Sequence, residues 1–156
     1  MTQCQVSDHQ PDNHSDELLL LENQLCFPLY SAANAVVRAY RPLLEQLDLT
    51  YVQYLVMMVL WQSNGISVKT LGEKLYLDSG TLTPLLKRLE SKGLVERRRS
   101  ESDERVRELY LTEKGTELRS KALSVPNEML CKFKLEVDEL IALKQLCEKV
   151  LSTLGQ

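Results

Sequence analysis

Residues 76–92 constrain the fold of this chain more than any other stretch, because they form a helix with two contrasting faces. Four leucines have the spacing of a buried helical stripe: Leu82, Leu85, Leu86 and Leu89. Short hydroxyl groups and two long cations occupy the opposite face, from Ser79, Thr81, Thr83, Pro84, Lys87 and Arg88. Such a face suits base edges and phosphates in a nucleic-acid groove. For the helix alone, a solvated surface with a few charges is an equally good interpretation.

The flanking sequence favours the nucleic-acid interpretation. Ser67 begins a short helix, and a brief turn connects it to the two-faced helix, which is the helix-turn-helix pattern. Downstream, two strand candidates at 94–99 and 106–112 flank a polar tip at 100–104. This hairpin is rich in arginine, with Arg97, Arg98, Arg99, Arg105 and Arg107. We therefore predict a mainly α fold with a small β-hairpin wing, a winged helix-turn-helix at about 50–112 that binds double-stranded DNA.

Pro84 leaves the start of the second helix open. The helix either starts at Asp78 and tolerates one missing hydrogen bond, or begins with Thr83 as its N-cap and Pro84 in its first position. The sequence alone does not decide between the two alternatives.

Capping residues and apolar spacing predict the remaining helices. A first helix capped by Ser15 or Asp16 extends to about Tyr40, is kinked or restarts at Pro28, and breaks at Pro42. Thr50 caps a helix that is apolar on nearly all sides from Tyr54 to Trp61 and therefore lies at the centre of the core. Near the C-terminus we expect three helices: one from Thr112 to Val125, one from Asn127 to Val137 after the break at Pro126, and one capped by Asp138.

The last helix predicts a dimer. Its apolar residues follow a 3-4-3-4 spacing that requires a partner helix: Leu140, Leu143, Cys147, Val150 and Leu154. A homodimer would present two recognition helices to successive major grooves. We expect residues 1–15 to be a disordered acidic arm and 16–156 one domain, with dimerisation helices at about 16–47 and 113–154.

Charge and composition exclude several classes of protein. The net charge is −3, but the first 25 residues carry five acids and no Lys or Arg, which leaves +2 for the rest. The sequence has no apolar run long enough for a membrane span and no secretory signal, so we expect a cytoplasmic location and no membrane partner. Its four cysteines lack CxxC and metal-ligand spacing, so we expect no metal, no cofactor and no permanent disulfide framework.

Each cysteine is interpreted separately. Cys4 lies in the predicted arm and is incidental, and Cys147 reads as a small buried hydrophobe. Cys131 points away from a predicted apolar face and is expected to be accessible; that face consists of Met129, Leu130, Phe133 and Val137. Cys26 flanks the apolar stripe of the first helix. Because free cysteines in proteins are usually buried, a core position is favoured for it.

Four segments between about residues 21 and 154 resemble the MarR family of winged-helix regulators, and in particular its organic-hydroperoxide-sensing repressors. They are Leu-Glu-Asn-Gln-Leu-Cys-Phe at 21–27, Leu-Thr-Tyr-Val-Gln-Tyr-Leu-Val at 49–56, the helix-turn-helix residues 75–89, and Ser-Asp-Glu-Arg at 102–105. The resemblance implies a homodimeric repressor that binds palindromic operator DNA when reduced. It also implies that the two-faced helix and the wing residues Arg98 and Arg105 contact DNA.

The resemblance assigns roles to two cysteines and two tyrosines. Cys26 would be the peroxidatic cysteine, with Tyr40 and Tyr51 donating hydrogen bonds to its sulfur. In two-cysteine members a second cysteine after a Val-Pro turn forms an intersubunit disulfide, and Cys131 follows Val125-Pro126 here. Cys147, Cys4 or a small thiol remain alternative resolving groups.

Two other functions remain open at this point. One is a MarR-type regulator that responds to a small aromatic ligand, with Cys26 structural. The other is a thiol peroxidase, but the chain is predicted not to be an enzyme, because the helix-turn-helix and the arginine-rich wing would then have no role.

Overall fold

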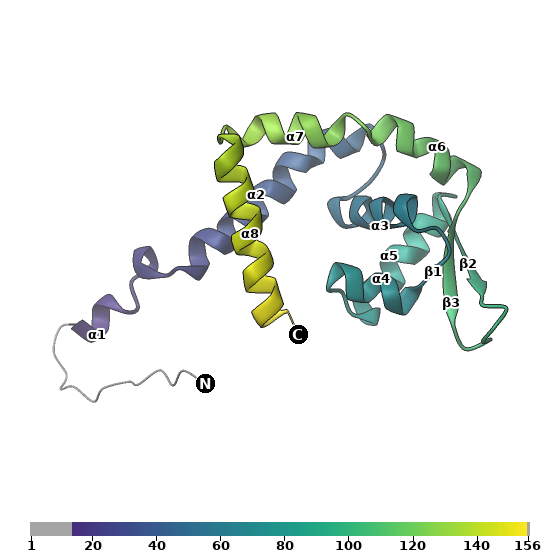
Figure 1. Ribbon diagram of the computed structural model, residues 1–156, viewed down its shortest axis with the longest axis horizontal. Coiled ribbons are helices and arrows are strands. Elements are labelled where there is room, and N and C mark those ends of the chain that lie inside the picture. The colour runs from purple at the N-terminus through teal and green to yellow at the C-terminus, as the bar shows by residue number, and fades with distance from the viewer. Residues whose placement is uncertain (1–13, 156) are drawn as a thin grey trace. The chain divides into compact units, whose positions relative to one another are not determined.

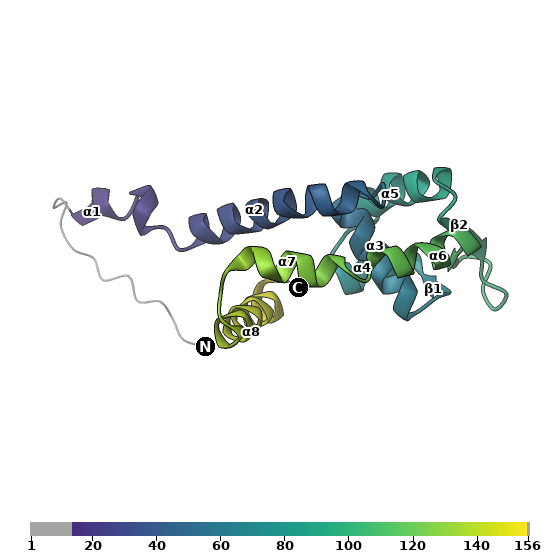
Figure 2. The same cartoon turned by 90° about the horizontal axis from the view of Figure 1, so that it is seen from above.

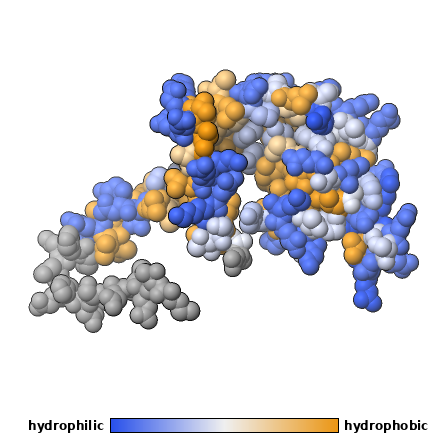
Figure 3. Space-filling model, in the orientation of Figure 1, coloured by the Kyte–Doolittle hydropathy of each residue, from blue (hydrophilic) through white to orange (hydrophobic). Residues whose placement is uncertain are grey.

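The computed structural model describes residues 14–155 (Figure 1), which fall into two compact units with a boundary between Arg38 and Ala39. The first unit contains α1 (His14–Glu17), the 3-10 turn η1 (Leu21–Asn23) and the beginning of α2 (Cys26–Glu45). Residues 1–13 of the predicted arm, Cys4 among them, lie outside the described residues, and α1 begins inside the arm at His14. Leucines of this unit are well exposed and form apolar surface at the left of Figure 3.

Helix α2 corrects one prediction about proline. A new helix, α2, begins at Cys26, so the predicted restart at Pro28 is confirmed. Pro28 lies in the first turn of α2, where backbone N–H groups have no intrahelical acceptor, so its missing N–H costs no hydrogen bond. The predicted break at Pro42 is wrong, because α2 continues to Glu45. Leu44 is buried and its carbonyl accepts hydrogen bonds from the N–H groups of Leu47 and Leu49, so packing and turn bonds hold the segment after the proline in place.

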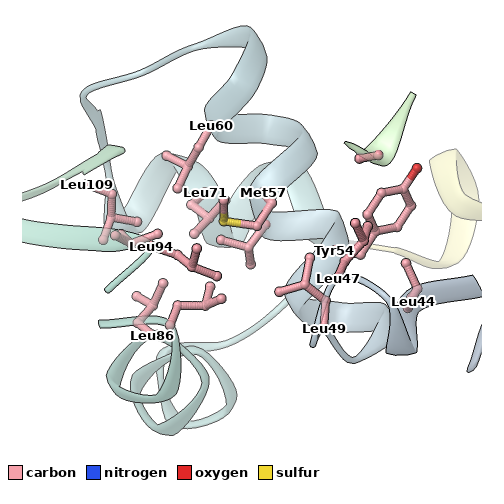
Figure 4. Close-up of a cluster of buried hydrophobic side chains, with 14 of the residues drawn as sticks. Leu44, Leu47, Leu49, Tyr54, Met57, Leu60, Leu71, Leu86, Leu94 and Leu109 are labelled. Atoms are coloured by element: carbon pink, nitrogen blue, oxygen red, sulfur yellow. The ribbon is translucent and has the colours of Figure 1, made fainter. Parts of the chain in front are cut away.

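Helix α3 (Tyr51–Gln62) is the centre of the core of the second unit, as its all-round apolar sequence predicts. Thr50 caps it through a capping box with Gln53, in which each residue bonds the backbone of the other. Val56, Met57 and Leu60 are fully buried, and Figure 4 shows Met57 and Leu60 facing leucines from the surrounding elements. The helix-turn-helix and the wing are therefore built on one rigid helix.

The helix-turn-helix consists of α4 (Val68–Leu75) and α5 (Ser79–Ser91). Asp78 is the N-cap of α5, and its carboxylate accepts a hydrogen bond from the Thr81 N–H. The helix therefore starts before Pro84 and tolerates the missing bond, which decides between the two alternatives that the sequence left open.

Three antiparallel strands form the wing and its base, in the order β1-β3-β2. The hairpin strands β2 (Val95–Arg99) and β3 (Arg107–Leu111) confirm the predicted wing. Strand β1 (Ile66–Ser67) was not predicted, because two residues are too short to show an alternating pattern; it pairs with Glu108 and Leu109 of β3.

Three helices follow the wing: α6 (Glu113–Ala122), α7 (Val125–Phe133) and α8 (Val137–Leu154). Thr112 caps α6 as predicted, but α7 starts at Val125, with Pro126 in its first turn, and ends at Phe133 rather than Val137. Lys134 ends it because its φ of 51° is left-handed. The N-cap of α8 is Glu136, in a capping box with Glu139, so the prediction of Asp138 is wrong.

Helix α8 has no buried residue in the single chain. Its exposed apolar residues include Leu143 and Val150 of the predicted seam, so the surface that would contact a partner helix is available. Within residues 14–155, none of the helices combines the length and the apolar composition that a membrane span requires.

Candidate nucleic-acid interface and redox site

The two faces of α5 separate as the sequence predicts. Leu82, Leu86 and Leu89 are buried, and every proposed contact residue of the outer face is exposed: Ser79, Thr81, Thr83, Pro84, Lys87 and Arg88. Hydrogen bonds from the Thr81 backbone N–H and hydroxyl lower the pKa of Asp78, which keeps this cap ionised. Hydroxyls and cations thus meet on one exposed face of α5, and the ionised Asp78 cap offsets the positive charge of the helix dipole at its start.

The register of the wing places its arginines on two faces. Arg97 pairs with Leu109 and Arg99 with Arg107 on one face, whereas Arg98 pairs with Glu108 on the other. Arg98 is engaged within that second face: its Nη2 donates to Glu96 Oε2 at 2.8 Å, and its guanidinium lies 4.7 Å from the centroid of the Tyr110 ring.

The second face of the wing is stiffened by a further hydrogen bond. The Tyr110 hydroxyl donates to Glu108 Oε2 at 2.8 Å. Hydrogen bonds from Ser100 and from Tyr110 lower the pKa of Glu108, so this carboxylate stays ionised beside Arg98. The structure thus gives Arg98 a role inside the wing.

A groove of about 1,040 Å³ lies between α4, α5 and the first face of the wing. Its lining includes Ser79 and Thr83 of α5 together with Arg97, Arg105 and Arg107, so it collects three guanidinium groups beside the hydroxyls. The predicted residue Arg105 is among them, whereas Arg98 is not. Arg97 and Arg107 were not predicted as site residues, although both lie on the same face of the hairpin as Leu109, and this alternation along the strands is the signal that could have identified them.

A partly buried ion pair fixes one wall of this groove. Arg97 Nη2 lies 2.8 Å from Glu90 Oε2, which joins β2 to the C-terminal turn of α5, and Figure 2 shows the end of α5 leading into β2. Both side chains are about one-third exposed, so solvent screens this pair less than a fully exposed one. The spacing of recognition helix and wing is therefore set within the unit.

Tyr40 and Tyr51, predicted to serve the sensing sulfur, lie together in the second unit. Tyr40 is on α2 and Tyr51 is the first residue of α3, and their ring centroids are 4.7 Å apart. Burial raises the pKa of both phenols, and the neighbouring Tyr51 and Tyr54 raise that of Tyr40 further. Both hydroxyls therefore remain protonated at neutral pH, which leaves each of them a proton to donate in a hydrogen bond.

The described cysteines are free thiols with different exposure. Cys26, the first residue of α2, is exposed, so the general expectation of a core position is wrong for the single chain. Cys131 is exposed as predicted, and Cys147 is only half-buried on α8. Leu130 is 50% exposed, against the prediction, because α7 buries only the line through Val125 and Met129. Among the described residues, no group of His, Cys, Asp and Glu could hold a metal ion.

These features define a winged helix-turn-helix protein in which three arginines line a groove beside α5, the class to which many transcriptional regulators belong. The family model of the transcriptional regulator SarA/Rot matches residues 38–122. The organic hydroperoxide resistance transcriptional regulator of Bacillus subtilis is 48% identical over 136 residues, which is 87% of this chain and 92% of the relative.

Solved structures of the regulator AbfR are also similar to this chain in sequence and fold. Reduced AbfR bound to DNA is 35% identical, with a TM-score of 0.74 over 92% of this chain and 99% of that one. AbfR in its disulfide-formed state is 33% identical, with a TM-score of 0.62 over 89% and 98% of the two chains. The chain belongs to the MarR family of winged-helix transcriptional regulators, in the branch of the organic hydroperoxide resistance regulators.

Proposed function

We propose that this protein is a redox-sensing repressor that binds palindromic operator DNA as a homodimer when reduced and leaves it when an organic hydroperoxide oxidises Cys26. The observation that carries the proposal is an exposed Cys26 in a chain with a basic DNA groove, 48% identical to an organic hydroperoxide resistance regulator. That AbfR, a relative, has been solved reduced on DNA and in a disulfide form supports the same cycle.

In the reduced state α5 enters the major groove and the wing contacts the neighbouring backbone. The outer face of α5 supplies the contacts to bases and phosphates, through Ser79, Thr81, Thr83, Pro84, Lys87 and Arg88. Arg105 reaches a phosphate or the minor groove from the wing tip, and Arg98 contributes positive charge from the second face. The seam on α8 and the N-terminal leucines bury their apolar surface against the second copy.

Oxidation proceeds in two steps. The Cys26 thiolate attacks the terminal oxygen of the hydroperoxide; an S–O bond forms and the O–O bond breaks, which gives the sulfenic acid and an alkoxide. The alkoxide takes a proton from water and leaves as an alcohol. The Cys131 thiolate of the other subunit then attacks the sulfenic sulfur, forms the disulfide and displaces hydroxide, which is protonated to water. Protonated Tyr40 and Tyr51 donate hydrogen bonds that stabilise the Cys26 thiolate.

Release follows from geometry. A disulfide requires Cα atoms within about 7 Å, so closing it between subunits draws the helices that carry the cysteines together. The spacing of the two winged units then no longer matches the two half-sites, and simultaneous binding is lost. The direct test is the affinity of reduced and hydroperoxide-treated protein for a duplex selected by the reduced protein from a random-sequence library.

Lys87→Ala and Arg105→Ala test the DNA interface. Each is expected to weaken binding across different sequences and to reduce the slope of log affinity against log salt by about 2, because each removes one phosphate contact per subunit and therefore two per dimer. Fluorescence anisotropy over a salt series measures this. Lys144→Ala is the matched control, since it also removes one exposed lysine, but from α8, outside the helix-turn-helix and the wing, where Lys144 pairs with Glu148. An unchanged slope in both variants contradicts the assigned interface.

Cys131→Ser tests the resolving cysteine. After treatment with cumene hydroperoxide, wild-type protein is expected to run as a crosslinked dimer on a non-reducing gel, and the variant as a monomer with Cys26 as sulfenic acid or mixed disulfide. Cys147→Ser is the control and should still crosslink, because its thiol is half-buried on the apolar side of α8. A crosslinked dimer from Cys131→Ser would make Cys147 or Cys4 the resolving residue.

A further inference from the structure

Lys92, at the C-terminal end of α5, joins the recognition helix to the loop between α2 and α3. It is the C-cap of α5, and its backbone N–H donates to the carbonyl of Arg88, whose side chain is a proposed DNA contact. Its Nζ donates to the carbonyl of Asp48 and to Gln53 Oε1, and lies 3.3 Å from Asp48 Oδ1. Only 27% of the Lys92 side chain is exposed, so these oxygens replace much of the hydration of the ammonium group.

Gln53 carries the connection to the tyrosine pair. This residue is buried, and its Oε1 accepts both from Lys92 and from the Thr50 N–H, at 3.1 Å, within the capping box of α3. Tyr51, which directly follows Thr50, packs its ring against Tyr40. One amide oxygen thus links the first turn of α3, on which a sensing tyrosine lies, to the end of α5.

Two further contacts make this junction stiff. Asp48 has a φ of 52°, a left-handed conformation that non-glycine residues adopt rarely, and the bond from Lys92 to its carbonyl holds it there. The carbonyl of Lys92 in turn accepts from Lys114 Nζ on α6, at 2.8 Å. The end of α5 is therefore bound to the α2–α3 loop, to α3 and to α6, and the chain of α6 leads on to α7 and Cys131.

We propose that Lys92 is a positioning residue that transmits a displacement of Tyr40 and Tyr51 to the recognition helix. This inference rests on the proposed function, since it explains how that redox signal reaches α5. When Tyr51 moves with the oxidised sulfur, the first turn of α3 moves with it, and Lys92 carries the C-terminal turn of α5 because its half-buried ammonium has these oxygens as partners. Arg88 and Lys87, one turn earlier, then shift relative to the phosphates.

The Asp48 carboxylate is not the carrier of this coupling. Its side chain is 87% exposed, so its attraction to Lys92 is screened by water and salt. The backbone carbonyl of Asp48 and the buried Gln53 amide are the partners that matter. If these partners transmit the displacement, removing the Lys92 donors changes the redox response, whereas neutralising the Asp48 carboxylate does not.

Lys92→Met keeps the apolar stem and removes the donors. In the reduced state its operator affinity is expected to stay within about threefold of wild type, whereas the ratio of reduced to oxidised affinity falls by at least about threefold, because the signal no longer reaches α5. Asp48→Asn, which keeps the backbone carbonyl, and Lys144→Met, which removes a lysine from the ion pair on α8, are expected to keep the wild-type ratio. Lys92→Arg, which keeps charge and donors, should retain the ratio within about twofold.

Hydrogen exchange of the free, reduced protein gives a readout that needs neither peroxide nor DNA. In Lys92→Met, amides in the first turn of α3, around Tyr54, and in the last turn of α5, around Lys92, are expected to exchange faster together, and those of α8 to remain unchanged. Faster exchange at α5 alone, or an unchanged affinity ratio in Lys92→Met, overturns the inference. If wild-type protein shows no loss of affinity on oxidation while the two turns still exchange together, the proposed redox function has failed and the mechanical link stands.

Discussion

Replacing Cys26 with serine is expected to leave operator binding intact and to abolish its loss on treatment with an organic hydroperoxide. A serine hydroxyl is not oxidised by a hydroperoxide, so neither the sulfenic acid nor the disulfide can form. The operator affinity of the wild-type protein should fall by about 5- to 150-fold on oxidation, the usual range of coupling between two sites. The affinity of the variant should not change. Anisotropy titrations with cumene hydroperoxide, before and after reduction with dithiothreitol, measure both values.

Cys147→Ser is the matched control for this experiment, because it removes a half-buried thiol from α8 and leaves the exposed Cys26 in place. It should respond to peroxide as wild type does. Release that survives in Cys26→Ser would favour a regulator that responds to a small aromatic ligand, with Cys26 structural. Sustained peroxide consumption with dithiothreitol, in protein that does not bind DNA, would instead favour a thiol peroxidase.

Substituting Gly115 with alanine is expected to destabilise the winged unit by about 3 kcal/mol, the upper part of the range for overpacked sites. A Cβ at this position of α6 would lie 2.1 Å from the carbonyl oxygen of Leu94, a contact that backbone atoms cannot relieve without moving α6 away from β2. That movement would also strain the hydrogen bond from Trp61 Nε1 to the Gly115 carbonyl, which measures 2.9 Å. The melting temperature should fall by about 6–12 °C for a chain of this length.

Differential scanning calorimetry at one fixed protein concentration makes this comparison, since dimerisation links stability to concentration. Ser120→Ala on the same helix is the control: Ser120 is exposed, its hydroxyl donates only to the carbonyl of Glu117, and its removal should change stability by no more than about 0.5 kcal/mol. A melting temperature for Gly115→Ala equal to that of the control would mean that α6 does not approach the wing closely.

The sequence determined the local elements, because their signals are local. The spacing of Leu82, Leu86 and Leu89 identified the buried side of α5, and the caps Thr50, Ser67 and Thr112 are confirmed at three helix starts. Each cap acts within three residues of its own position, so no distant contact can change what it does. The family resemblance likewise rested on contiguous segments, and the relatives confirm it.

The tertiary structure decided what depends on contacts between distant residues. Helix α2 continues through Pro42 because the core holds Leu44, and strand β1 exists because Ile66 meets Leu109 of β3. The register of the wing separated Arg98, held by Glu96 and Tyr110, from Arg97 and Arg107, which line the groove with Arg105. Lys92 and Gly115 look unremarkable in the sequence; their partners lie tens of residues away, and only the folded chain brings those atoms into contact.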